Sequence, residues 1–293
     1  MTITVLLAAL TALGIAFTLV LLRRAAARGE LKPNLEAIGL GAITNFFDTL
    51  GIGSFAPSTA WIKFRRLVPD SFIPAILNTG HALPTVVQAS VFLVILGVHV
   101  DPTLLASCIV SAVLGAVVGA RYVVHAPVRL IQGVVGVALL IAACLYTMSN
   151  LDLFPAGGDA TALPTAKMIV AIVVHFALGA LMAFGIGLYA PSLILLSLLG
   201  LDPRLAFPIM ASACAFLMPT TGFKFMKTDR IDLKVVLGIT LGGIPACLVA
   251  ALIVKELPIV WLRWGVVVVV LYAAALLLRS AFRGTGVLVG DTR

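Results

Sequence analysis

Two short motifs rich in glycine and proline could together bind a small anion. Residues 51–58 read Gly-Ile-Gly-Ser-Phe-Ala-Pro-Ser and residues 185–192 read Gly-Ile-Gly-Leu-Tyr-Ala-Pro-Ser, so the second copy begins 134 residues after the first. Glycine lets the backbone bend and approach a ligand closely, and proline suits the first turn of a helix. Each motif therefore predicts a helix N-terminus whose unpaired N–H groups favour an anion.

Hydroxyl groups beside the two bends would add further donors. Serine side chains can instead bond back to the carbonyls of their own helix, and that alternative stays open for Ser58 and Ser192. The substrate-binding residues that we predict within the motifs are Gly51, Gly53, Ser54, Pro57, Ser58, Gly185, Gly187, Tyr189, Pro191 and Ser192.

A second group of polar residues follows each motif inside the next apolar run. Asn78 and His81 follow the first motif, and Ser212 and Thr220 follow the second. Asn78 and Ser212 are related by the same spacing of 134 residues. Polar groups at membrane depth are costly unless they face the protein interior, so we expect these four to line the same cavity.

Asp48 and His81 are the ionisable residues that we predict to couple a proton to transport. Both lie within apolar runs, where an ionisable side chain is a functional candidate. A carboxylate at the first bend would repel an anion unless it were protonated, and histidine titrates near neutral pH. Alternatively, Asp48 caps the bend by accepting a hydrogen bond from the amide of Gly51 or Gly53.

The sequence gives no sign of an enzyme, a cofactor or a metal. The four cysteines lie in apolar runs without CxxC spacing, and the four histidines have no ligand spacing. The first motif lacks the third glycine of a dinucleotide-binding loop. The net charge of +8 comes from basic residues in short connections between apolar runs, which argues against nucleic acid as a partner.

Composition indicates a protein embedded in a membrane. Hydrophobic residues make up 61% of the chain and charged residues 11%, and the mean hydropathy is +1.17. Several apolar stretches are long enough to span about 30 Å of hydrocarbon. A soluble protein is excluded.

Basic residues set the expected topology. The apolar run 37–62 has basic clusters at 23–32 and 63–66 on its two sides, so both flanks are expected in the cytoplasm. We interpret that run as a re-entrant hairpin, and the long run 166–200 as a second hairpin that enters from outside. A kinked crossing in each place is the alternative. The expected fold is an all-α polytopic membrane protein with about seven transmembrane helices, two re-entrant hairpins, an outer N-terminus and a cytoplasmic C-terminus.

The duplication divides the chain into four parts. Residues 1–34 form a first transmembrane helix and a basic cytoplasmic loop, 35–148 the first repeat, 149–165 an external loop and 166–293 the second repeat. Each repeat holds one hairpin and three crossings, which is an odd number of crossings. The two repeats are therefore expected to be inverted relative to one another, as in many transporters.

The paired motifs resemble those of the sulfite exporter TauE/SafE family of membrane permeases. The resemblance also includes a helix with Gly115, Gly119, Ala120 and Arg121 ahead of Pro127, although its counterpart in the second repeat has Ala246 and Ala250 at the glycine positions. It implies a permease of the bacterial inner membrane that moves sulfite, thiosulfate or a sulfonate. The implied site residues are the glycines and prolines of the two motifs, with Asn78 and Ser212.

The expected function is secondary transport of a small sulfur-containing anion, with the site between two half-helix N-termini. An anion channel, a carboxylate permease of the same architecture and a non-transporting membrane scaffold are the alternatives. The expected partners are the small anion and the lipid bilayer, together with a second copy of the chain in a homodimer, because twofold assemblies are the commonest.

Overall fold

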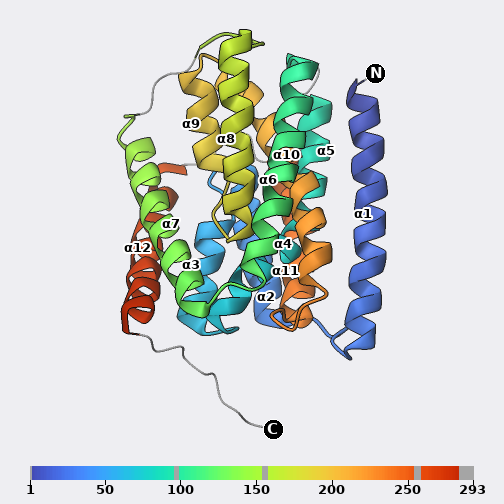
Figure 1. The fold of residues 1–293 in the computed structure, drawn as a ribbon, viewed down its shortest axis with the longest axis vertical. Helices are drawn as coiled ribbons and strands as arrows, with labels where there is room; N and C mark the ends of the chain where they lie inside the picture. The colour runs from blue at the N-terminus through green and yellow to red at the C-terminus, as the bar shows by residue number, and fades with distance from the viewer. Residues whose placement is uncertain (1, 96–98, 154–157, 254–258, 284–293) are drawn as a thin grey trace.

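The fold is that of an all-α membrane protein. The computed structural model describes residues 2–95, 99–153, 158–253 and 259–283, and these residues form helices and no strand (Figure 1). The α-helices are α1 (Thr2–Ala27), α2 (Leu35–Thr49), α3 (Phe55–Arg65), α4 (Ile73–Gly80), α5 (Ala82–Ile95), α6 (Pro102–Val123), α7 (Val128–Asn150), α8 (Thr165–Ala183), α9 (Tyr189–Leu198), α10 (Pro203–Phe225), α11 (Leu233–Ile253) and α12 (Ile259–Arg283). A 3₁₀ turn, η1 (Asp70–Phe72), precedes α4.

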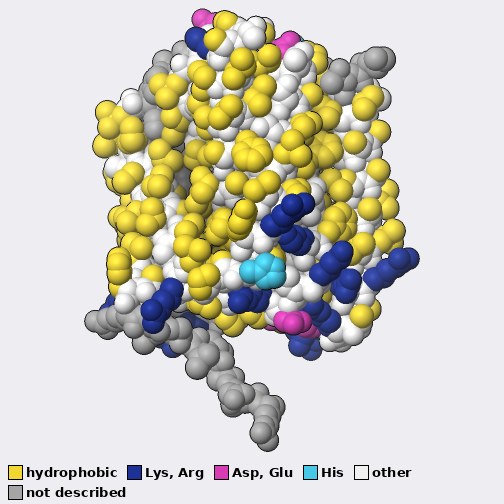
Figure 2. All heavy atoms as spheres, in the orientation of Figure 1, with side chains coloured by type: hydrophobic (Ala, Val, Ile, Leu, Met, Phe, Trp, Pro, Cys, Tyr) yellow, Lys and Arg dark blue, Asp and Glu magenta, His cyan; other side chains and the backbone are white. Residues whose placement is uncertain are grey.

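Six of the described helices are long and apolar enough to cross a membrane. They are α1, α6, α7, α8, α10 and α11. Apolar side chains cover the flank of the molecule, and Lys and Arg gather at the end where α1 finishes (Figure 2). The seven crossings predicted from the sequence differ from these six helices. They leave out α8, which is assigned to a hairpin, and they include α12 as well as α4 and α5 together as one crossing. The count of seven stays a prediction. Residues 284–293, which include the predicted cytoplasmic C-terminus, lie outside the described residues.

Two helix pairs reverse direction at the duplicated motifs. The first helix of each pair ends just before its motif, and the second begins inside it: α2 stops at Thr49 and α3 starts at Phe55, while α8 stops at Ala183 and α9 starts at Tyr189. In Figure 1, α2 and α3 both lie in the lower half of the molecule, and α8 and α9 both lie in the upper half. The chain therefore turns back near mid-height in each pair instead of continuing through as a kinked helix.

Glycines allow two pairs of helices to pack backbone against backbone. The most extensive helix contacts are those of α2 with α11, α6 with α8, and α7 with α12. A Cβ atom on Gly242 of α11 would overlap the carbonyl of Ile38 in α2, and one on Gly115 of α6 would overlap the carbonyl of Phe176 in α8. Small residues at such contacts let membrane helices approach closely, which favours association in lipid.

Helix α11, which corresponds to α6 in the second repeat, therefore also packs closely through glycines. Ala246 and Ala250 do replace the glycines at the corresponding positions, but α11 meets α2 through Gly238 and Gly242, which lie earlier in the helix. The close packing of α6 on α8 thus has a counterpart in α11 on α2 that uses other glycines.

Buried side chains form two separate clusters. The larger cluster includes residues of α1 to α6 and of α8 to α11, whereas the smaller one joins α7 and α12 to Ile52 of the first bend and Ala60 of α3. The pair α7 and α12 stands at one side of the molecule in Figure 1. A cavity at the hairpin bends lies between these two clusters.

The close contact of α11 with α2 predicts a specific loss of stability. Replacing Gly242 with alanine should lower the free energy of unfolding by about 1–3 kcal/mol, because a methyl group has no space beside the Ile38 carbonyl. Gly133→Ala on α7 is the matched control, since no atom of the described part of the chain lies within 4 Å of its Cβ position. It should be neutral or stabilising by up to about 1 kcal/mol. Thermal unfolding in detergent would measure both, and equal melting temperatures would contradict the packing.

Candidate functional site

The helix ends before the two bends are closed by the same hydrogen bonds, although Gly53 has φ +88° and its counterpart Gly187 has no positive φ. At the end of α2, Ile52 N–H donates to the carbonyl of Phe47 (3.1 Å) and Gly51 N–H to that of Asp48 (2.9 Å). At the end of α8, Ile186 and Gly185 donate to Leu181 (3.3 Å) and Met182 (2.9 Å) in the same way. Both patterns are Schellman motifs, which satisfy carbonyls at a helix end and place the next residue in the left-handed region. Gly51 has φ +90° and Gly185 has φ +96°, as that geometry requires.

A single cavity lies between the two bends. It has a volume of about 60 Å³ and is lined by residues 52–56 of the first hairpin, by Ile186, Gly187, Leu188, Tyr189 and Pro191 of the second, and by side chains of α2, α5, α7, α8 and α10. Its volume is enough for a few water molecules or a small ion. The hairpin N-termini that the sequence predicted to converge therefore do contribute to one cavity.

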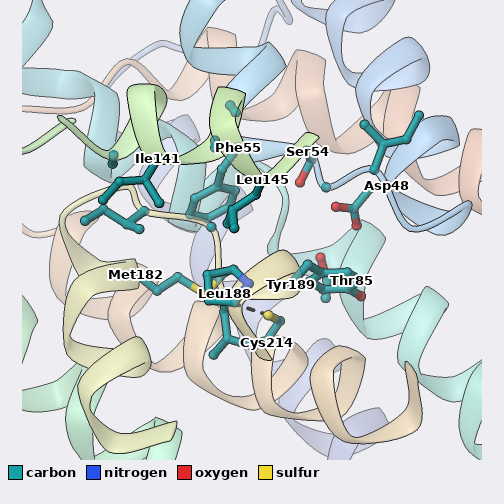
Figure 3. A pocket seen from close by; sticks show the side chains of 18 of the residues that line it. Asp48, Ser54, Phe55, Thr85, Ile141, Leu145, Met182, Leu188, Tyr189 and Cys214 are labelled. Carbon is teal, nitrogen blue, oxygen red and sulfur yellow. Dashed lines mark hydrogen bonds between the residues drawn. The ribbon is translucent and has the colours of Figure 1, made fainter. Parts of the chain in front are cut away.

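The cavity is polar on one side and apolar on the other. Asp48, Ser54, Thr85 and Tyr189 lie together on the polar side, and Ile141, Leu145, Met182 and Leu188 form much of the apolar side (Figure 3). The four polar residues are between 2% and 6% exposed. Tyr189 Oη has no hydrogen-bond partner among the described residues. The site therefore offers one free hydroxyl and one carboxyl group to a ligand.

The structure brings together only part of the predicted site. Asp48, Gly53, Ser54, Gly187, Tyr189 and Pro191 line the cavity, whereas Gly51, Pro57, Ser58, Asn78, His81, Gly185, Ser192, Ser212 and Thr220 do not. Two further residues line the cavity, Thr85 of α5 and Cys214 of α10, and neither is among the predicted substrate-binding residues. Both lie in apolar runs as small, weakly polar residues, which are common in membrane helices and give little signal.

Ser58 is held by a buried histidine and is not free to donate to a ligand. Its hydroxyl lies 3.0 Å from Nε2 of His81, and Nδ1 of His81 lies 3.0 Å from Oδ1 of Asn45. The Asn45 amide nitrogen donates to the carbonyl of Gly41, so Oδ1 must accept from Nδ1–H of the neutral ring. Nε2 then accepts from the Ser58 hydroxyl. His81 thus fixes α3 against the junction of α4 and α5.

The second hairpin contains an equivalent serine–histidine pair, but its histidine comes from a different part of the fold. The Ser192 hydroxyl lies 2.9 Å from Nε2 of His175, whose Nδ1 donates to the carbonyl of Ala171 (2.8 Å). His175 is on α8, and Gly41 occupies the corresponding position in the first hairpin. The sequence analysis missed His175, although an ionisable residue inside an apolar run is the signal that singled out His81.

The remaining polar residues of the predicted cavity serve packing. Asn78 Nδ2 donates to the carbonyls of Pro74 and Met182, both at 2.9 Å, and so joins α4 to the end of α8. Thr220 donates back to the carbonyl of Phe216 on its own helix. Ser212 is fully buried away from the cavity. Asn78 and Thr220 therefore bond to backbone carbonyls, whereas the Ser212 hydroxyl has no hydrogen-bond partner among the described residues. Their role in binding stays a prediction.

Asp48 does not cap the bend with its side chain. The Gly51 amide donates to the main-chain carbonyl of Asp48, while the carboxyl group lies beside the hydroxyl and amide of Ser54 and the side chain of Gln88. Asp48 therefore faces the start of α3 and the cavity, as Figure 3 shows.

Comparison with known proteins adds no relative to this picture. No family model, no curated protein and no solved structure matches the chain.

The two glycines of the second bend should differ in their tolerance of a side chain. Gly185→Ala should lower the free energy of unfolding by about 1–2 kcal/mol, because alanine is strained at φ +96°. Gly187 has no left-handed φ, and a Cβ there would meet Phe55 at an ordinary 3.6 Å. Gly187→Ala should therefore retain stability. A melting curve in detergent tests the pair, and equal losses in both variants would contradict the assigned geometry.

The serine–histidine pairs should contribute to stability. Ser58→Ala leaves Nε2 of His81 buried without a donor, so the free energy of unfolding should fall by about 1–3 kcal/mol. Ser192→Ala should have a similar effect through His175. Ser90→Ala is the control, because that half-buried hydroxyl only bonds back to Val86 of its own helix. If Ser58→Ala were as stable as Ser90→Ala, the hydrogen bond would not hold α3.

Proposed function

We propose that the protein is a secondary transporter of a small sulfur-containing anion, such as sulfite or an organosulfonate. The observation that carries this proposal is one cavity lined by both hairpin bends, at the N-termini of α3 and α9. Broken helices that meet in the middle of a bundle are the usual binding sites of secondary transporters. The positive ends of their dipoles favour an anionic substrate.

An inverted duplication is the second part of the proposal. The hydrogen bonds that end α2 recur at the end of α8, and the pattern at the end of α3 recurs at the end of α9, where Leu67 and Leu201 donate to Ile62 and Leu196. The hairpins lie in opposite halves of the molecule (Figure 1). When two such repeats exchange conformations, the cavity opens first to one side of the membrane and then to the other, as alternating access requires.

The family and the substrate are proposed from the motifs. Their resemblance to TauE/SafE permeases supports a sulfur anion, and the sulfur atoms of Met182, Cys214 and Met218 in the cavity wall suit a polarizable ligand. A carboxylate permease of the same architecture is the second candidate, because the apolar side of the cavity would also hold a short carbon chain.

We propose the bacterial inner membrane as the location, with the basic end of the molecule in the cytoplasm. Lys and Arg gather at the end where α1 finishes (Figure 2), and cytoplasmic loops carry the excess of such residues. This orientation places the start of α1 outside. A homodimer is the proposed assembly.

Proteoliposomes loaded with radiolabelled sulfite or ethanesulfonate would test transport directly. Saturable uptake that speeds up when unlabelled anion is present inside would establish a carrier. Flux far above carrier rates without such exchange would indicate a channel, and the absence of flux for sulfur anions and carboxylates alike would reject the proposal.

Filling the cavity should stop transport without unfolding the protein. Ala142 of α7 lines the cavity, so Ala142→Phe should reduce flux at least about tenfold by blocking the space between the bends. Val137→Phe on the same helix is the control, because Val137 is 50% exposed on the outer flank and should retain flux. Uptake would be compared at equal amounts of reconstituted protein. Equal flux in both variants would place the substrate elsewhere.

A further inference from the structure

The cavity contains a negative side chain and no positive one. Asp48 is the only carboxylate among the described residues that line it, and no Lys, Arg or His lines it. Asp48 is 3% exposed and lies in the membrane-embedded part of the fold. An anion that enters this space meets a like charge in a medium of low dielectric, which is strongly unfavourable unless one of the two groups carries a proton.

Among the residues that the structure describes, no cationic group faces Asp48 from the surrounding helices. Its neighbours are Ser54 of α3, Gln88 and Thr85 of α5, Tyr189 of α9 and the thiols of Cys214 and Cys247 on α10 and α11. His81 does not line the cavity, and its ring nitrogens lie 3.0 Å from Ser58 Oγ and from Asn45 Oδ1. No fixed cation among the described residues therefore balances the charge of Asp48 when an anion is bound, whereas a proton on its carboxyl group does.

An unpaired hydroxyl marks where the ligand would bind. Tyr189 is 6% exposed, lines the cavity from the first residue of α9, and its Oη has no partner among the described residues. A buried hydroxyl without a partner is costly, and a bound acceptor would remove that cost. In Figure 3 its ring lies beside Thr85 on the side of the cavity that holds Asp48. The polar group of a ligand would thus contact Tyr189 and Asp48 together.

The opposite side of the cavity limits what the rest of the ligand can be. Ile141, Leu145, Met182 and Leu188 offer no hydrogen-bonding group from their side chains, so an oxygen turned towards them would lose its hydration without replacement. Sulfate carries oxygens on every side, and both sulfate and thiosulfate bring a second negative charge that one proton does not balance. A short carbon chain behind a single charged head fits both sides of the cavity.

We propose that the cavity carries a monovalent organic anion together with one proton shared between that anion and Asp48, so that each transport cycle moves no net charge. This inference rests on the proposed transport function and narrows its substrate to short-chain organic monoanions. The proton enters and leaves with the anion, and Tyr189 donates a hydrogen bond to the head group throughout.

Flux measurements in proteoliposomes separate this inference from transport itself. Uptake of radiolabelled ethanesulfonate should follow an imposed pH gradient and should not change when valinomycin and potassium impose a membrane potential. Sulfate and thiosulfate should not compete. Uptake that follows the potential, or equal competition by the divalent anions, would overturn the inference while leaving transport established. If no anion moved at all, the proposed function would fail as well.

Two single-group variants test the assigned roles. Asp48→Asn should abolish accumulation driven by the pH gradient and make net uptake of ethanesulfonate respond to the membrane potential. Asp159→Asn, at an exposed position, is its control and should leave both properties unchanged. An Asp48→Asn protein that still accumulates anion with the pH gradient would overturn the role of Asp48.

Tyr189→Phe removes only the unpaired hydroxyl. Because that hydroxyl has no partner among the described residues, the melting temperature should be retained. The KM for ethanesulfonate should rise about tenfold or more through loss of a hydrogen bond to a charged group. Thr59→Val removes another fully buried, unpartnered hydroxyl, which does not line the cavity, and should leave KM unchanged. An unchanged KM in Tyr189→Phe, or an equal rise in both variants, would overturn the assignment.

Discussion

The satisfaction of backbone hydrogen bonds at the two helix breaks is the constraint on which the rest of the structure depends. A chain that stops being helical inside a membrane exposes carbonyls and N–H groups that lipid cannot bond. Here the ends of α2 and α8 are closed by the same Schellman hydrogen bonds, with Gly51 and Gly185 in the left-handed region. The starts of α3 and α9 are left with donors that face a cavity. The carbonyls at the ends of α2 and α8 are thus hydrogen-bonded within the bends, and the N–H groups at the starts of α3 and α9 are available for a ligand.

The two hairpins are fixed in different ways, although their motifs are nearly identical. Ser58 bonds to His81, which belongs to the junction of α4 and α5, so the first hairpin is attached to the central helices of the bundle. Ser192 bonds to His175 on α8, so the second hairpin is closed on itself. A pair of repeats that share a fold can therefore differ in which contacts must break when one of them moves. In these terms, the second hairpin can move as a unit without losing its serine–histidine bond.

Much of the fold was predictable because its causes are local. Glycine and proline at 51–57 and 185–191 mark the breaks, and the spacing of 134 residues between the motifs also relates Arg66 to Gly200, which both take positive φ at the ends of α3 and α9. The site was harder, because helix rotation decides which polar side chain meets the cavity. Asn78 and Thr220 had the right residue type and depth, yet both donate to helix carbonyls. His175 was missed because its partner Ser192 lies at a spacing that the first hairpin does not share.

The positive field at the helix N-termini, which makes the bends suitable for an anion, also acts on the carboxylate of Asp48. Helix N-termini favour negative charge through partial charges that the fold cannot remove. A carboxylate placed at the start of α3 already takes advantage of that field, since it lies beside the amide and hydroxyl of Ser54. A substrate anion must then compete with Asp48 for the same donors. Competition between a fixed and a mobile anion for one set of donors links binding to protonation, because a proton on Asp48 frees the Ser54 donors for the substrate. Coupling by this route needs no charged partner elsewhere in the cavity, and the residues that line it include none.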